Sequence, residues 1–293
     1  MTTGPKAAWS LSNQVSITEA PPWRRIRANG IPDHATGSFP NRGNPNSIRA
    51  QSYDFQLPLS PTANAQPTPM RTGISFGVAV NGVLFDPFTA EFWNRSPRSG
   101  WVYEALTGGL NLGLDANNAH VQPNGAYHYH GIPKGLIRQW SPSVHSPILG
   151  WAADGFPIYV LVGFSDPRNP NSGARILRSS WTLKTGNRPG GNEGPGGAYD
   201  GRFTADWTYQ EGRGDLDICN GRYCVTPDFP EGTYAYFLTE DFPVIPRFHR
   251  GTPIAAFQQG QGGGSPPGGG PQHGGGSGIR RPPPGGGPPR HGP

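Results

Sequence analysis

The chain has 293 residues, and its 45 glycines and 35 prolines make up about a quarter of it. Long runs of helix-forming residues are absent, so we expect a mainly β, loop-rich protein with one β-sandwich-like domain. The formal net charge is +5, but three arginines and no acid lie beyond residue 257, which leaves +2 for the rest of the chain. This charge excludes an extensive nucleic-acid-binding surface, and no apolar run approaches the ~20 residues of a membrane span.

Composition divides the chain into three parts. Residues 1–28 are polar and irregular, and we expect an extended N-terminal arm. Residues 29–257 carry the hairpin signals and are expected to form one β domain. Of the 36 residues in 258–293, 24 are glycine or proline, so this C-terminal tail cannot bury a core and is expected to be disordered.

The first strong hairpin signal lies at residues 73–86. Two apolar segments, 73–80 and 83–86, flank Asn81 and Gly82. An Asn-Gly pair supplies the two positive φ angles of a type I′ turn. We therefore predict a two-residue hairpin loop and place this hairpin in the core.

The next hairpin holds three of the eight histidines within residues 120–130. Its turn, Pro123-Asn124-Gly125, suits a three-residue loop in which the glycine is left-handed. In this register His120 lies opposite His128, and the two-residue period of a strand puts His130 on the same side. The tyrosines between them point the other way. We predict a solvent-wetted histidine face and an apolar tyrosine face.

Tyr127-His128-Tyr129-His130-Gly131, followed by GWAADGFPIY at residues 150–159, resembles the YHYH-domain family of bacterial, mostly exported proteins. The similarity runs from about residue 29 to about residue 257 and includes LDICNG at 216–221. The resemblance implies a secreted or periplasmic location. It implies no activity, because the family name only describes the motif. The first thirty residues lack the apolar core of a signal peptide, so either a signal has been removed or the chain is not exported.

A second hairpin repeats the pattern of the histidine hairpin. Residues 114–129 and 216–236 both read L-D-x-x-N followed by P-x-G-x-Y-x-Y. We infer two related hairpins whose tyrosine faces share one interior. The positions of the three histidines are taken in the second copy by Arg222, Ala235 and Phe237. The hairpin therefore needs its tyrosines but not its histidines.

The two cysteines, Cys219 and Cys224, flank Asn-Gly-Arg-Tyr, a segment with the composition of a hairpin loop. Such a loop brings its flanking residues within disulfide reach, so we predict a disulfide. Two free buried thiols are the alternative. A zinc site would need two more ligands, which this neighbourhood does not offer.

Three imidazoles on one hairpin face can hold one transition-metal ion and leave one coordination position open. All three ligands are nitrogen, which suits Zn or Cu. We predict that His120, His128 and His130 bind one such ion, with Asp154 and His145 as candidates for orienting the ligands. The alternative is a set of exposed histidines that contact neighbouring groups.

Two functions are compatible with this site. One is a metal-dependent enzyme in which Asp154, or Glu193 in the glycine-rich loop 186–200, accepts a proton. The other is a non-catalytic extracellular module that binds a glycan or a protein through its tryptophans and tyrosines. Enzyme or not, the partner is expected to be a small molecule or a glycan, and the sequence leaves the oligomeric state open.

Overall fold

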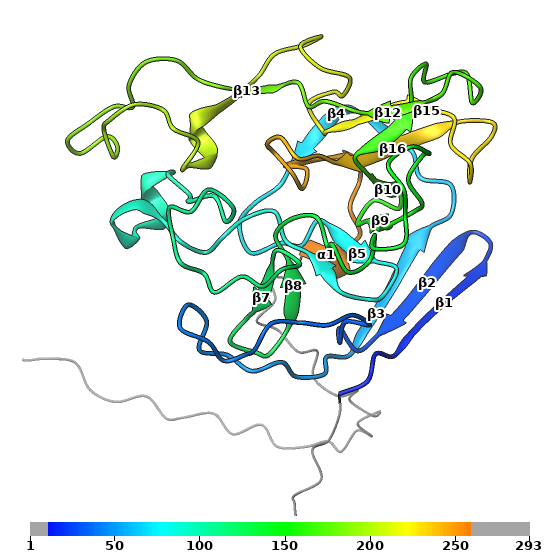
Figure 1. Cartoon of the computed structure of the whole chain (residues 1–293), viewed down its shortest axis with the longest axis horizontal. Coiled ribbons are helices and arrows are strands. Elements are labelled where there is room, and N and C mark those ends of the chain that lie inside the picture. The colour runs from blue at the N-terminus through cyan, green and yellow to red at the C-terminus, as the bar shows by residue number, and fades with distance from the viewer. Residues whose placement is uncertain (1–10, 259–293) are drawn as a thin grey trace, which may run out of the picture. The chain divides into compact units, whose positions relative to one another are not determined.

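The computed structural model describes residues 11–258 (Figure 1). The predicted disordered tail lies outside the described residues from residue 259 on, as do the first ten residues of the predicted arm. The described part is mainly β, as predicted, and its helices are short. They are η1 (Trp93–Arg95), η2 (Pro97–Ser99), η3 (Thr204–Asp206) and α1 (Ala255–Gln258). Within residues 11–258 there is no helix with the length and apolar character that crossing a bilayer requires.

An eight-stranded sheet forms the centre of the domain. In spatial order its strands are β15 (Gly221–Cys224), β16 (Thr233–Leu238), β10 (Pro157–Val160), β9 (Gly150–Ala152), β5 (Gly77–Ala79), β6 (Leu84–Phe85), β8 (Tyr127–Tyr129) and β7 (Ala119–Val121). The order places the two tyrosine hairpins, β7–β8 and β15–β16, at opposite ends of the sheet.

The sheet consists of two halves with the same pairing. In the first half, β5-β6-β8-β7, strand β6 runs parallel to β8 and Phe85 pairs with Tyr129. In the second half, β9-β10-β16-β15, strand β10 runs parallel to β16 and Ile158 pairs with Tyr236. The halves meet where β5 pairs antiparallel with β9. The repeat seen in the sequence is therefore part of a larger repeat that covers each whole half.

The loop between β5 and β6 corrects one prediction. It has three residues rather than two, because the Ala79 N–H donates to the Val83 carbonyl at 2.8 Å and the left-handed residue is Gly82, with φ +82°. Asn81 instead contributes hydrogen bonds from its side chain. Its Nδ2 donates to the Tyr129 hydroxyl at 2.9 Å, and its Oδ1 accepts the Val83 N–H at 3.2 Å. A type I′ turn would point the Asn81 side chain in another direction and break these two hydrogen bonds. The contact with Tyr129 therefore favours the three-residue loop.

One face of the sheet carries the apolar interior that the two tyrosine hairpins share. The four motif tyrosines are at most 1 % exposed and belong to a single apolar cluster. They are Tyr127, Tyr129, Tyr234 and Tyr236. The predicted shared interior is confirmed.

The opposite face is covered at its centre by a three-stranded sheet of β1 (Val15–Ala20), β2 (Trp23–Ala28) and β3 (Tyr53–Pro58), drawn in blue in Figure 1. Ile26 and Leu57 from this sheet pack with Val78 and Leu84 of the eight-stranded sheet. Exposed and buried residues alternate along β2, as expected of a strand with one buried side, and Arg24 is among the buried ones. The predicted arm is therefore built into the domain from Val15 onward.

Three two-stranded sheets complete the described strands. They are β4 (Ala63–Pro69) with β17 (Phe248–Gly251), β11 (Val162–Phe164) with β12 (Ala174–Ile176), and β13 (Trp181–Leu183) with β14 (Trp207–Tyr209).

The predicted disulfide is wrong, because Cys219 and Cys224 are both free and buried. The segment between them does not form a loop. It enters strand β15, in which Gly221 pairs with Tyr236 and Cys224 pairs with Thr233. The four residues from Gly221 to Cys224 are extended, which carries Cys224 away from the turn that holds Cys219. The two thiols accordingly belong to different apolar clusters.

Candidate metal centre

The histidine hairpin has the predicted register. The Gln122 N–H donates to the Ala126 carbonyl at 2.9 Å, and the Gly125 N–H donates to the Gln122 carbonyl at 2.8 Å. Gly125 is left-handed, with φ +90°. These bonds close the three-residue loop and place His120 directly opposite His128.

His130 follows the end of β8, and a backbone bond sets its position. Its N–H donates at 2.7 Å to the carbonyl of Asn118, which has φ +55°. The second half repeats this bond, since the Phe237 N–H donates to the Asn220 carbonyl at 3.0 Å and Asn220 has φ +54°. The strand and the residue after it thus aim His120, His128 and His130 to one side, as predicted.

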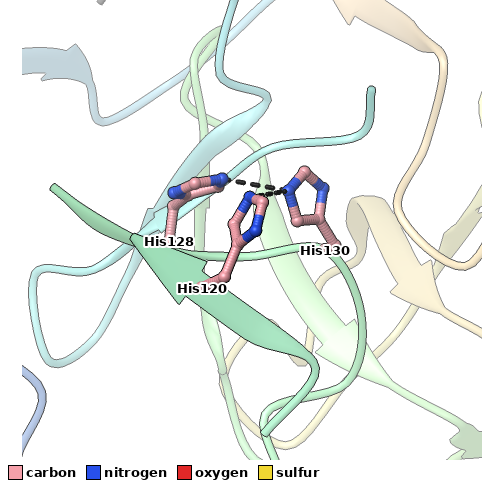
Figure 2. A group of neighbouring side chains, drawn as sticks. All are labelled: His120, His128 and His130. Carbon is pink, nitrogen blue, oxygen red and sulfur yellow. Dashed lines mark hydrogen bonds between the residues drawn. The ribbon is translucent and has the colours of Figure 1, made fainter. Parts of the chain in front are cut away.

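The three imidazoles converge through their Nε2 atoms (Figure 2). The Nε2 of His130 lies 2.9 Å from that of His128 and 3.1 Å from that of His120. Three nitrogens placed around one tetrahedral Zn ion at 2.0–2.1 Å would be about 3.3 Å apart. The two distances from His130 differ from this value by a few tenths of an ångström, and the ligand atoms of the three residues all lie within 4.8 Å of one another.

Two of the rings have a tautomer set by the backbone. The Nδ1 of His120 lies 2.8 Å from the Leu112 carbonyl, and the Nδ1 of His128 lies 3.2 Å from the Ala126 carbonyl. A carbonyl can only accept, so each Nδ1 carries the hydrogen and each neutral ring presents a lone pair at Nε2. This is the arrangement typical of metal-bound histidines, which donate their other N–H to a carbonyl or carboxylate.

The nitrogens cannot satisfy one another. The Nε2 of His130 faces two lone pairs and has at most one hydrogen to offer, so no tautomer gives two well-aligned bonds. The Nδ1 of His130 has no hydrogen-bond partner within residues 11–258. A single cation bound by all three Nε2 atoms would resolve this conflict.

Two of the three imidazoles on the histidine face are buried and His120 is half-buried, which corrects the prediction of a wetted face. His128 is 2 % exposed and His130 is 5 % exposed. The loop at residues 41–46 lies over the edge strand β7, where the side-chain amides of Asn44 and Asn46 donate to the Val121 carbonyl at 2.9 and 2.8 Å. Nothing in the hairpin sequence reveals this distant loop.

Burial also sets the protonation state. Desolvation lowers the pKa of all three imidazoles, and for His128 it does so to about 3, with His120 adding to the effect. At neutral pH the rings are therefore uncharged, which is the form that binds metals.

A cavity of 460 Å³ reaches all three histidines. Its walls include Asp86, which the sequence analysis missed. Asp86 is 3 % exposed, its Oδ1 has no partner within the described residues, and its Oδ2 accepts from the Gln122 side chain at 3.3 Å. Burial raises the pKa of this carboxyl to about 7. The repeat of the half-sheet could have revealed Asp86. Phe85 and Ile158 occupy equivalent positions, and the residue that follows is an acid, Asp86, in the first half but Tyr159 in the second.

The other predicted site residues lie elsewhere. The carboxylate of Asp154 accepts from the Tyr236 hydroxyl at 2.5 Å and from the Gly251 N–H at 2.8 Å, which makes it the second-half counterpart of Asn81. His145 packs against Tyr159, with ring centroids 5.0 Å apart. Neither residue lines the cavity at the three histidines.

Glu193 is also away from the three histidines. Its side chain is exposed, and its backbone carbonyl accepts from the Trp101 indole N–H at 3.1 Å. It does not line the histidine cavity. The structure thus brings together the three predicted ligands and leaves the predicted proton acceptors and orienting groups apart from them.

The second half shows what this face contains when it carries no histidines. Arg222 pairs with Ala235 in the register that His120 and His128 have in the first half. Ala235 and Phe237 belong to an apolar cluster that also includes Tyr159. The same backbone arrangement therefore occurs in the second half with an arginine, an alanine and a phenylalanine in place of the three imidazoles.

These features define a mainly β protein with a duplicated half-sheet and a buried three-histidine centre in one half. A family model described as "YHYH protein" matches residues 54–251, and the chain belongs to this family. No curated protein and no solved structure matches the chain.

Proposed function

We propose that the chain binds one transition-metal ion through the Nε2 atoms of His120, His128 and His130. The convergence of these three atoms, with two Nδ1 atoms committed to backbone carbonyls, is the observation that carries the proposal. An all-nitrogen ligand set favours Zn or Cu over Mg or Ca, which prefer oxygen.

Three protein ligands leave a fourth position for an exchangeable group. The three histidines border a cavity, and Asp86 is among the residues that line the same cavity. Asp86 therefore replaces Asp154 and Glu193 as the proton acceptor in the proposed role of a metal-dependent enzyme. Export of the chain stays a prediction, and its cysteines give it no support because they are not bonded.

Calorimetric titration of the chelator-stripped protein with ZnCl₂ and with CuSO₄ tests the proposal. We expect one ion per chain and a loss of affinity of at least about a hundredfold in the His128→Ala/His130→Ala variant, because removing a ligand costs more than removing its supporting partner. The matched control is His34→Ala, which removes a histidine that contacts Tyr129 instead of the centre.

The histidines of the tail, His273 and His291, are present in the parent and in both variants, so any binding to them cancels in the comparison. Equal affinity in the parent and the double variant would show that the three-histidine centre does not hold the ion.

A further inference from the structure

A second and larger space lies against His130. It is a cleft of 710 Å³ that His130 borders but His120 and His128 do not. One wall is aromatic and includes Trp181 of β13, Trp207 of β14 and Phe242.

The aromatic wall is fixed in place. The Trp207 and Phe242 rings stack with an interplanar angle of 3° and centroids 4.7 Å apart. Both indole N–H groups are bound to backbone carbonyls, that of Trp181 to Ile218 at 3.2 Å and that of Trp207 to Gly201 at 3.3 Å. Both tryptophans are half-buried. A ligand therefore meets rigid apolar rings whose polar atoms are already committed.

The charged groups of the cleft balance one another. Arg178 pairs with Asp241 at 2.8 Å near the rim, where both are exposed. A buried pair joins Arg247 and Glu104 at 2.6 Å.

Two further charged residues of the cleft, Arg213 and Glu240, are exposed and form no ion pair within residues 11–258. With three arginines and three carboxylates the cleft carries no net charge. A strongly anionic or cationic ligand would find as many like charges as opposite ones.

The chemistry of the lining indicates a neutral ligand rich in hydroxyl groups. An arginine only donates hydrogen bonds and a carboxylate only accepts them, whereas a hydroxyl does both. A ring that carries hydroxyls at its edge and C–H groups on its faces can satisfy the rim and also pack on aromatic side chains.

We propose that this cleft binds a neutral saccharide. The saccharide would lie with one end against His130, and so beside the ion, an arrangement that rests on the proposed function.

Intrinsic tryptophan fluorescence of the full chain in EDTA provides the test. The probes are cellohexaose, xylohexaose, maltohexaose and N-acetylchitohexaose, with hexagalacturonate as the anionic comparison. We expect a saturable response to at least one neutral probe and a weaker one to hexagalacturonate. Trp207→Ala should weaken the neutral probe's binding about tenfold or more, as for a buried aromatic anchor. Trp23→Ala, on β2 and outside the cleft, is the matched control and should leave it unchanged.

The Arg213→Ala/Glu240→Ala variant keeps the proposal testable if Trp207→Ala does not fold, because both side chains are exposed. It should weaken binding about fivefold or more. The proposal is overturned if none of the four neutral probes binds, if hexagalacturonate binds more tightly, or if the rim variant binds like the parent.

A His120→Ala variant separates this proposal from that of the metal centre. His120 borders the histidine cavity but not this cleft, so the variant should lose metal binding and retain saccharide binding in EDTA. Loss of saccharide binding in this variant would contradict a cleft that works independently of the centre. If no saccharide binds while Zn still does, the saccharide proposal is overturned and the metal proposal is unaffected.

Discussion

Each imidazole of the centre is limited by its neighbours in what it can do. His120 and His128 donate their Nδ1 hydrogens to backbone carbonyls, and burial keeps both rings neutral. What remains at Nε2 is a lone pair directed at a third imidazole. Two lone pairs facing one nitrogen store an unfavourable contact that a cation removes.

Asp86 provides a prediction about pH. Its pKa is near 3.8 in an unfolded chain and about 7 in the folded chain. Because the folded-state pKa is raised, this residue's contribution to stability is complete below about pH 4 and is lost as pH rises through 7. The difference corresponds to at most about 4 kcal/mol.

Asp86→Asn removes this pH-dependent penalty. In EDTA, urea unfolding should show the variant gaining stability over the parent at pH 8, with a smaller gain at pH 5. Added Zn should reduce the difference in stability between the variant and the parent at pH 8, because a nearby cation favours the ionised carboxylate of the parent. A gain equal at both pH values would mean that Asp86 does not titrate abnormally.

At the scale of the element, the histidine hairpin depends on one left-handed glycine. A Cβ at Gly125 would meet the Arg49 side chain at 2.5 Å and would require an L-residue at φ +90°. Gly125→Ala should therefore lower the free energy of unfolding by about 1–2 kcal/mol or more. Because the same turn sets the pairing of His120 with His128, the variant should also bind Zn more weakly.

Gly173→Ala is the matched control for this substitution. Gly173 has φ +75° and nothing within 4 Å of its Cβ position, and it lies next to β12, outside the eight-stranded sheet. Gly173→Ala should lower the free energy of unfolding, because it also places an L-residue at a positive φ, but it should leave the Zn affinity unchanged. If both glycine variants weaken Zn binding to the same extent, the effect reflects general destabilisation and not the hairpin register.

Local patterns predicted the elements whose determinants lie close together in the chain. The three-residue turn and the period of a strand were enough to place the histidines on one side. The errors came from contacts across long sequence distances. Asn44 covers a face that looked exposed, Tyr129 redirects Asn81, and pairing with β16 converts the segment before Cys224 from a loop into a strand. Asp86 was missed because its partners are brought to it only by the parallel pairing of β6 with β8.

At the scale of the whole molecule, the two half-sheets act as an internal comparison. They share strand order, parallel pairing and a buried hydrogen bond between a loop side chain and a motif tyrosine, in which Asn81 donates to Tyr129 and Tyr236 donates to Asp154. They differ on the face opposite the tyrosines, where one half has three imidazoles beside a cavity and the other has an apolar cluster. The two halves thus share their backbone arrangement, and only the first half has the candidate metal ligands.

Transferring the second half's residues to the first tests this division. In a His120→Arg/His128→Ala/His130→Phe variant, apolar groups replace two buried imidazoles, and the adjoining 460 Å³ cavity offers room for the larger side chains. We expect one cooperative unfolding transition with a stability within about 2 kcal/mol of the metal-free parent, since buried polar groups without good partners contribute little. Zn should no longer raise the unfolding temperature of the variant, whereas it should raise that of the parent through binding to the folded state. A variant that folds and still binds one Zn per chain would place the ion outside the three histidines, and one that cannot fold would make them structural.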